Sequence, residues 1–202
     1  MLTVNSLSCE RGERLLFKDL SFSLPPGEIA QITGKNGAGK SSLLKIIAGL
    51  ARPLSGIVSW QNQTIEHDRT AYAALICYLG HLDGVKVGLS VAENLHFSRC
   101  LMQGSLNKEA LAIQHLGLTQ QANILVEDLS AGQKRRVALA QLLVSSAKLW
   151  ILDEPFTSLD KQTITILERM FAEHCIKGGM IVVATHQPLN ISNVPIQTYE
   201  LV

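Results

Sequence analysis

The sequence predicts an α/β fold whose core is a parallel sheet of phosphate-loop type, and three observations support this prediction. An apolar run, Ile29 to Thr33, passes directly into a glycine-rich loop that is followed by a helical pattern. Two further runs, Leu149–Leu152 and Met180–Ala184, are apolar without interruption, which is typical of parallel strands buried on both faces. The composition, 47% hydrophobic but only 5% aromatic, fits such a core.

The N-terminal part of the chain is predicted to be mostly β-structure. Residues 20–24 alternate between apolar side chains and serine, the period-two pattern of a half-buried strand. A Pro-Pro-Gly turn at 25–27 ends this strand. The other elements predicted here are a strand beginning at Leu2, a helix at Ser41–Leu50, a hairpin within Ile57–Ile65 and a buried strand at Ile76–Leu79.

The C-terminal part is predicted to alternate helices and strands. The pattern from Ser90 to Leu118 is helical, and another helix begins near Ala131. A helix from about Asp160 to Cys175 joins the two apolar runs, because parallel strands need a crossover between them. With 202 residues and no repeat or linker, the chain is expected to form one compact module.

Composition argues against several classes of function. The net charge of +1 gives no reason to expect nucleic-acid binding, and the basic run Lys134-Arg135-Arg136 is interpreted as the solvated face of a helix. The four cysteines show no metal-ligand spacing, so a reducing compartment and no structural metal are expected. The N-terminus lacks signal-peptide features, and no apolar run approaches the ~20 residues that span a bilayer. Any membrane-spanning part is therefore expected to belong to a partner.

The glycine-rich loop is predicted to bind the phosphates of a nucleotide. Consecutive backbone N–H groups can surround an anion only where side chains do not block its approach, which the glycines ensure. The helix after the loop directs its positive end to the phosphates, Lys40 reaches the β- and γ-oxygens, and the Ser41 hydroxyl ligates Mg²⁺. The residues expected at the nucleotide are Gly34, Lys35, Asn36, Gly37, Ala38, Gly39, Lys40, Ser41 and Ser42.

Two carboxylates close the Leu149–Leu152 strand, where burial makes a charge unfavourable unless it has a function. Asp153 is predicted to join the Mg²⁺ shell and Glu154 to polarise the attacking water. Taken alone, the pattern fits a strand-end cap equally well, but Lys40 upstream favours the catalytic interpretation. His186 follows the next apolar strand at the same polar edge, where an isolated histidine is usually structural.

A turn, Ser130-Ala131-Gly132-Gln133, opens a helix between the phosphate loop and the acidic strand end. Motifs in this order resemble the ATPase subunits of ABC transporters, over essentially the whole chain. The resemblance implies one ABC ATPase domain at 1–202, with an antiparallel β-subdomain near the N-terminus and an inserted helical subdomain at about 88–138. It also implies that Ser130, Gly132 and Gln133 hold the ATP of a second copy, so that two copies sandwich two nucleotides.

The same resemblance gives roles to two more residues. His186 takes the position of the histidine that contacts the γ-phosphate, and so joins Lys40 and Glu154 in the catalytic set. Asp160, in Ser158-Leu159-Asp160, lies in the loop that runs along the dimer seam. It also makes a good N-cap for the next helix, and both interpretations can hold together.

Two positions depart from the family pattern. His81 stands where most relatives have a glutamine near Mg²⁺ and the water; a neutral imidazole likewise supplies one acceptor and one donor, and a solvent-facing histidine without a role is the alternative. Arg11 stands where relatives have an aromatic residue that stacks on adenine. Together with Gly84-Val85-Lys86 and residues 89–95, these departures are similar to the ATPase subunits of the haem transporters of cytochrome c maturation.

The resemblance thus implies an ATPase that drives haem transfer across the bacterial inner membrane. It would be held peripherally on the cytoplasmic side by integral membrane subunits and would not contact haem itself. A transporter of another small molecule, such as a lipid or a drug, is the alternative. ATPase heads of DNA-maintenance proteins need a long insertion before Ser130, for which the chain leaves no room. A module that only holds ATP has no need of both Glu154 and His186.

Overall fold

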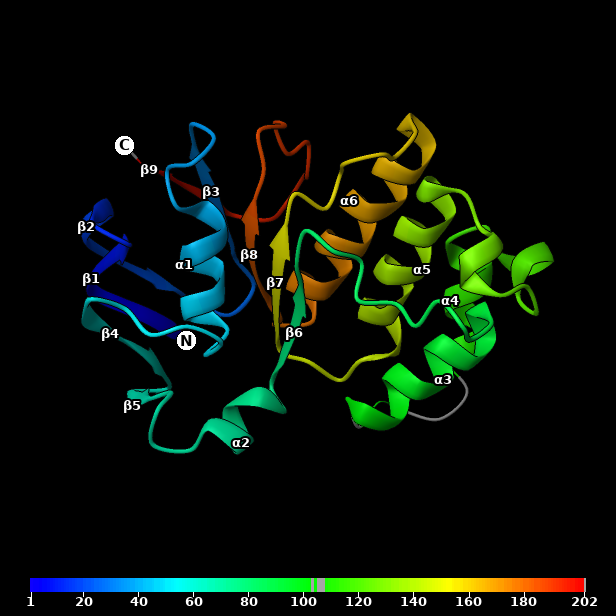
Figure 1. Cartoon of the computed structure of the whole chain (residues 1–202), viewed down its shortest axis with the longest axis horizontal. Coiled ribbons are helices and arrows are strands. Elements are labelled where there is room, and N and C mark those ends of the chain that lie inside the picture. The colour runs from blue at the N-terminus through cyan, green and yellow to red at the C-terminus, as the bar shows by residue number, and fades with distance from the viewer. Residues whose placement is uncertain (103, 105–107, 202) are drawn as a thin grey trace.

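The structure, a computed structural model, describes residues 1–102, 104 and 108–201, and these form two sheets with helices around them (Figure 1). Sheet A is antiparallel, in the order β2 (Arg14–Leu24), β1 (Leu2–Arg11), β4 (Ser55–Trp60), β5 (Gln63–Thr64). Sheet B is parallel, in the order β6 (Ile76–Leu79), β7 (Leu149–Asp153), β8 (Met180–Ala184), β3 (Ile29–Gly34), β9 (Ile196–Leu201). The predicted α/β fold is confirmed.

Helices cover both faces of sheet B in Figure 1, where α1 lies towards sheet A and the longer helices lie on the opposite side. None of the described helices is both long and apolar enough to cross a bilayer. The helices are α1 (Lys40–Ile47), α2 (Arg69–Ala73), α3 (Val91–Leu101), α4 (Glu109–His115), α5 (Ala131–Val144) and α6 (Lys161–Ile176), with 3₁₀ turns at Thr119–Gln121 and Val126–Asp128.

Most predicted elements are present with small changes of boundary. The strands at Ile76–Leu79 and Met180–Ala184 have the predicted bounds. The helical stretch predicted from 90 to 118 is divided between α3 and α4, and its residues 103 and 105–107 lie outside the described residues. Among the described elements, the two 3₁₀ turns were not predicted, nor were the edge strand β9 and the short helix α2, which Asp68 caps by accepting a hydrogen bond from the Ala71 N–H.

Sheet B is the shared wall of two hydrophobic clusters. Because successive side chains of a strand point to opposite faces, Trp150 and Leu152 enter the cluster formed with α3, α4, α5 and α6. Leu149 and Ile151 enter the other cluster, which lies between sheet B, α1 and sheet A. The unbroken apolar runs of β7 and β8 are therefore explained by burial on both faces, as predicted.

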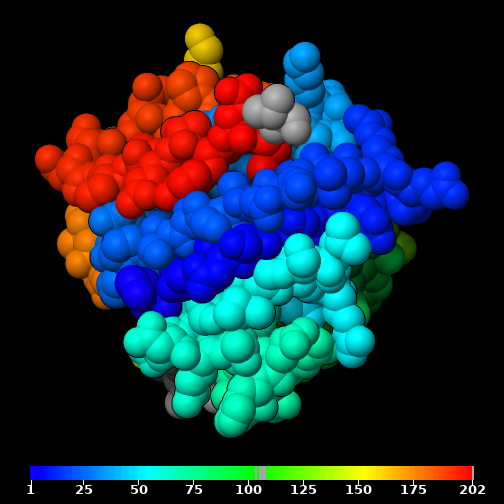
Figure 2. All heavy atoms as spheres, turned by 90° about the vertical axis from the view of Figure 1, so that its left-hand side faces the viewer, coloured from blue at the N-terminus to red at the C-terminus, as the bar shows by residue number. Residues whose placement is uncertain are grey.

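The C-terminal strand ties the two sheets together. Figure 2 shows the C-terminal segment, in red, lying along the N-terminal strands, in blue. Tyr199 of β9 stacks on Phe22 of β2, with ring centroids 4.6 Å apart. Leu201 is buried in the cluster that contains α1.

The two tryptophans of the chain belong to different clusters. Trp60 lies in the cluster with α1 and sheet A, whereas Trp150 lies in the cluster with the long helices. The Trp150 ring stacks on His174 with centroids 3.9 Å apart. Burial lowers the pKa of His174 to about 4, so its imidazole is neutral at physiological pH.

The loop between β6 and α3 is held by a buried asparagine. Asn94, only 1% exposed, accepts a hydrogen bond from the backbone N–H of Lys86 at 2.7 Å. Its amide nitrogen faces the carbonyl oxygens of Lys86, Leu89 and Ser90 at 2.9–3.1 Å. One side chain therefore bonds to three residues of this loop, in addition to the loop's own backbone hydrogen bonds, and fixes its exit into α3.

We expect Asn94→Asp to destabilise the fold, because a carboxylate would turn an oxygen towards three carbonyl oxygens that now share an amide donor. The free energy of unfolding, measured by urea denaturation, should fall by roughly 3 kcal/mol. Asn123→Asp, at an exposed position, is the matched control and should change it by less than ~0.5 kcal/mol. Equal effects of the two substitutions would contradict the role given to Asn94.

Candidate nucleotide site

The carboxyl ends of four parallel strands bring the predicted site residues to one edge of sheet B. His81 follows β6, Asp153 and Glu154 end β7, and His186 follows β8. The glycine loop leaves β3 at the same edge, because β3 and β8 run parallel in register. Segments that are far apart in the sequence therefore converge on one place.

A cavity of about 440 Å³ opens at this edge. The predicted site residues that line this cavity belong to the glycine loop, to the ends of β6 and β7, and to the β1–β2 hairpin. Arg14 and Leu16 of β2 also line it and were not predicted. The lining residues are Arg11, Arg14, Leu16, Asn36, Gly37, Gly39, Lys40, Ser41, Ser42, His81, Asp153 and Glu154.

Lys40 is held in place at the mouth of the loop. Its side chain is largely buried, at 8% exposure, and Nζ donates to the carbonyl oxygens of Gly34 at 2.7 Å and Lys35 at 3.3 Å. Nζ also lies 3.0 Å from Nε2 of His186. The ammonium group therefore has a defined position above the loop, where it can meet a phosphate.

His186 connects two side chains of the glycine loop with Glu154, which lies far from them in the sequence. Its Nε2 lies 3.2 Å from Oδ1 of Asn36 and 3.6 Å from Oε1 of Glu154, in addition to the contact with Lys40. When Nε2 carries its lone pair it accepts from Lys40, and when it carries a proton it donates to Asn36 or Glu154. The tautomer of the imidazole therefore decides which of these contacts is a hydrogen bond.

Two glycines allow the loop its course. Gly39 precedes α1 with φ +101°, in the left-handed region that favours glycine, and turns the chain into the helix. Gly34 has φ +136°, and a Cβ there would lie 2.5 Å from the carbonyl oxygen of Leu201. The first loop glycine is therefore required by the close approach of β9 as well as by the loop itself.

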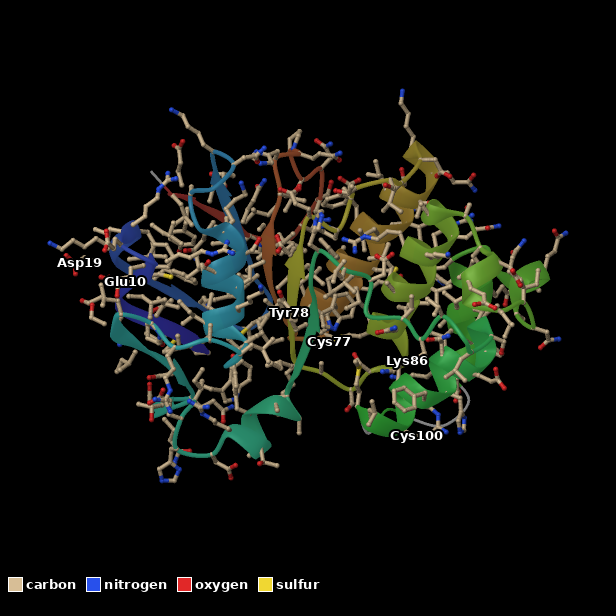
Figure 3. All side chains as sticks on the ribbon, in the orientation of Figure 1. Glu10, Asp19, Cys77, Tyr78, Lys86 and Cys100 are labelled. Atoms are coloured by element: carbon tan, nitrogen blue, oxygen red, sulfur yellow. The ribbon has the colours of Figure 1, made fainter. Side chains whose placement is uncertain are left out.

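Asp153 lies at the buried end of β7, with 3% exposure, and shares the cavity with Ser41. Tyr78, labelled in Figure 3, lies on β6 and pairs with Ile151 of β7, two residues before Asp153. Burial raises the pKa of Tyr78, and the negative charge of Asp153 raises it further. The Ser41 hydroxyl and the Asp153 carboxylate, both hard oxygen ligands, therefore line one cavity.

The turn at 130–133 lies apart from this cavity. Ser130 and Gln133 form a reciprocal capping box, because the Ser130 hydroxyl accepts from the Gln133 N–H and the Gln133 side chain accepts from the Ser130 N–H. Gly132 is packed so closely that a Cβ there would lie 3.2 Å from the carbonyl oxygen of Ser158. A side chain at this position would therefore need the Ser158 backbone to shift slightly.

Asp160 caps α6, as one of the two interpretations predicts. The backbone N–H of Thr163 donates to its carboxylate at 2.7 Å, and this bond lowers the pKa of Asp160. Asp160, like Ser130, Gly132 and Gln133, does not line the cavity at the glycine loop. These four residues are thus separate from the nucleotide site of their own chain.

His81 is exposed and lies between two cavities. It lines the cavity at the glycine loop and an adjacent one of about 200 Å³. Glu154 also lines both, so the two spaces meet at these side chains. The remaining residues of the smaller cavity are Asp83, Ala131, Arg135, Thr157 and Ser158.

The interpretation of Lys134-Arg135-Arg136 as a solvated helix face is wrong for Arg135. Its side chain is 5% exposed and bonds to the turn that follows β7. Lys134 and Arg136 are partly exposed and donate to the carbonyl oxygens of Glu127 and Leu116. The charge run gave no signal of this burial, because the acceptors of Arg135 come from a distant part of the chain.

Comparison with known proteins identifies the family. The sequence model described as "ABC transporter" matches residues 17–157, which include the glycine loop, the turn at 130–133 and the Asp153-Glu154 pair. The chain belongs to the ABC transporter family. A relative in Escherichia coli (strain K12), named cytochrome c biogenesis ATP-binding export protein CcmA, is 45% identical over 201 residues, covering 100% of this chain and 96% of that protein.

Solved ABC structures share the fold. One described as the ATP-binding subunit of an ABC transporter superposes with a TM-score of 0.84 at 26% identity, covering 92% of this chain and 79% of that one. Another, the dimeric structure of an ATP-binding cassette with ADP and Pi in a post-hydrolysis state, gives a TM-score of 0.78 at 24% identity, covering 93% and 88%. This ABC protein is thus an ATP-binding ATPase with the antiparallel sheet and the phosphate-loop sheet that the resemblance implied.

We expect His81→Gln to retain much of the ATPase activity of the assembled complex, because a glutamine amide also offers one acceptor and one donor at the junction of the two cavities. His81→Ala should lose more activity than ATP affinity, since it removes both groups but leaves the phosphate loop intact. His67→Ala, at an exposed histidine near α2, is the control. Full activity of His81→Ala would leave His81 without a role.

Proposed function

We propose that this chain is the ATPase subunit of an exporter that serves cytochrome c biogenesis, with haem as the transported group. The observation that carries the proposal is the 45% identity to the E. coli protein named for that process, which extends over the whole of this chain. The departures from the common ABC pattern at Arg11 and His81 also support it, because they resemble those of the haem-transporter ATPase subunits. Both residues line the nucleotide cavity.

The single domain at 1–202, with its helical subdomain at about 88–138, positions the groups for hydrolysis. In this proposal the loop from Gly34 to Ser42 holds the phosphates, and Lys40 neutralises their charge. Arg11, opposite Arg14 in the hairpin, lies where it can contact the base or the phosphates of the nucleotide. Glu154 accepts the proton of the attacking water, and His186 reaches the γ-phosphate from beside Lys40.

The side chains of Ser41 and Asp153, which line one cavity, fit a magnesium ion. The Ser41 hydroxyl and the Asp153 carboxylate would hold it, with His81 at the edge of the same cavity. When bound, Mg²⁺ would supply charge neutralisation to the β- and γ-phosphates.

A second copy of the chain completes the site in this proposal. The turn at Ser130, Gly132 and Gln133, with Asp160, does not reach the nucleotide cavity of its own chain, and its hydrogen-bond donors begin a helix. The solved cassette with ADP and Pi is a dimer, which supports the same arrangement here. The dimer would bind integral membrane subunits at the cytoplasmic side of the bacterial inner membrane, as a peripheral protein.

The test of the function is made in the organism that encodes the chain. Deleting the gene should abolish haem-bearing c-type cytochromes, detected by haem staining, and the parent gene should restore them while Glu154→Gln should not. Membrane proteins that co-purify with the parent chain from detergent extracts identify its partners. Normal c-type cytochromes in the deletion strain would overturn the assignment to cytochrome c biogenesis.

We expect Glu154→Gln to keep ATP bound and to slow hydrolysis by about 10²–10⁴-fold, because the amide preserves shape but cannot accept the proton. Lys40→Ala is the contrasting variant and should lose productive nucleotide binding, since it removes the cation that meets the phosphates. Bound nucleotide and the rate of phosphate release are both measured. Parent-like hydrolysis by Glu154→Gln in the assembled complex would remove Glu154 from its proposed role.

We expect Ser130→Asp to separate dimerisation from folding. Aspartate is a good N-cap, so α5 and the stability of the single chain should change little, by less than ~0.5 kcal/mol. The added negative charge would repel the phosphate of a partner's ATP, so ATP-dependent dimerisation of a Glu154→Gln protein should be lost in sedimentation experiments. If nucleotide affinity of the monomer falls instead, the turn acts on the nucleotide of its own chain.

A further inference from the structure

Arg135 is the most deeply buried cation near the site among the described residues that the function above does not use. It lies early in α5, and its guanidinium group reaches the turn after β7. Nη2 donates to the carbonyl oxygens of Glu154 at 2.7 Å and Asp153 at 3.3 Å, and Nε donates to that of Pro155 at 3.3 Å. Three successive carbonyls of the catalytic turn thus share one side chain.

This turn needs support from outside its own backbone. Glu154 has φ +47°, a conformation that a residue with a side chain rarely adopts. Its N–H donates to the carbonyl oxygen of Ala184 on β8, and its own carbonyl accepts from Arg135. The Glu154 backbone is therefore held on one side by the sheet and on the other by the guanidinium group.

Arg135 is also bonded to the loop that carries His81. Its Nη1 donates to Oδ1 of Asp83 at 2.9 Å, and the Asp83 side chain is only 28% exposed. Figure 1 shows this loop leaving β6 and passing towards α5. A planar guanidinium group with donors on both edges is suited to such a junction, whereas a lysine ammonium group is not.

We propose that Arg135 is a positioning residue for Glu154, and that Asp83 completes this link and couples the loop after β6 to the catalytic turn. One ion pair then joins three segments: the helix that opens with the Ser130 turn, the turn that carries Glu154 and the loop that carries His81. A displacement of the loop moves the Glu154 backbone through Asp83 and Arg135, which gives a means of regulating hydrolysis. The proposal rests on the role of Glu154 in the proposed function.

The decisive variant is Asp83→Asn, which weakens the ion pair but leaves the three carbonyl bonds of Arg135 intact. We expect kcat for ATP to fall roughly tenfold, as small misplacements of a catalytic group do, with KM and the ATP dissociation constant unchanged within about twofold. Amide hydrogen exchange at 153–157, measured without nucleotide, should become roughly tenfold faster. Asp83→Glu keeps the carboxylate and should restore most of kcat.

Arg135→Lys tests the other side of the pair. It keeps the charge but loses the two-edged donor group, so it should lower kcat and accelerate exchange at least as much as Asp83→Asn. Lys134→Gln is the matched control, because Lys134 lies on the same turn of α5 but donates to Glu127, away from the catalytic turn. If Arg135→Lys does not fold, the Asp83→Asn variant still tests the proposal, because Asp83 is more exposed than Arg135.

The outcomes separate this proposal from the function on which it rests. Parent-like kcat and parent-like exchange in Asp83→Asn, beside an active parent enzyme, would overturn the link and leave the ATPase role of Glu154 intact. An effect on ATP affinity without an effect on exchange would also contradict it. If the role of Glu154 itself fails, the exchange experiment still decides whether Asp83 and Arg135 hold the turn, because it needs no ATP.

Discussion

The parallel register of β3, β7 and β8 is the constraint on which the site depends. Asp153 of β7 and Ile32 of β3 both pair with Ala184, the last residue of β8, so β7 and β8 end level and β3 runs two residues further, to Gly34. His186 can then lie 3.0 Å from Lys40 and 3.6 Å from Glu154, although the three residues come from different parts of the sequence. A slip of one residue in the pairing of β7 with β8 would turn Asp153 to the opposite face of the sheet and open this cluster.

In the proposed dimer, the turn at 130–133 offers the second copy a surface that is already ordered in the single chain. The capping box between Ser130 and Gln133 already fixes the start of α5, and Gly132 lies close to the backbone of Ser158. Little conformational freedom remains to be lost when another molecule binds there. Arg135, one turn further along the same helix, then places the Glu154 backbone in a fixed relation to that surface.

Features that depend on a short stretch of chain were predictable from the sequence. The glycine loop, the acidic end of β7 and the capping of α6 by Asp160 each follow from local spacing and backbone chemistry. The burial of Arg135 was not predictable, since its acceptors meet only after β7 has packed beside α5. The strand β9 was missed because its polar and apolar residues read as surface, and only the free edge of β3 makes them a strand.

The shared wall formed by sheet B has a consequence for how the molecule unfolds. Since β7 and β8 supply alternate side chains to both clusters, neither cluster can open without exposing the back of the other. The chain is therefore expected to lose its structure in one cooperative transition rather than in two steps. Trp60 and Trp150 place one intrinsic fluorophore in each cluster, so the emission of single-tryptophan forms reports separately on the two halves of one melting event.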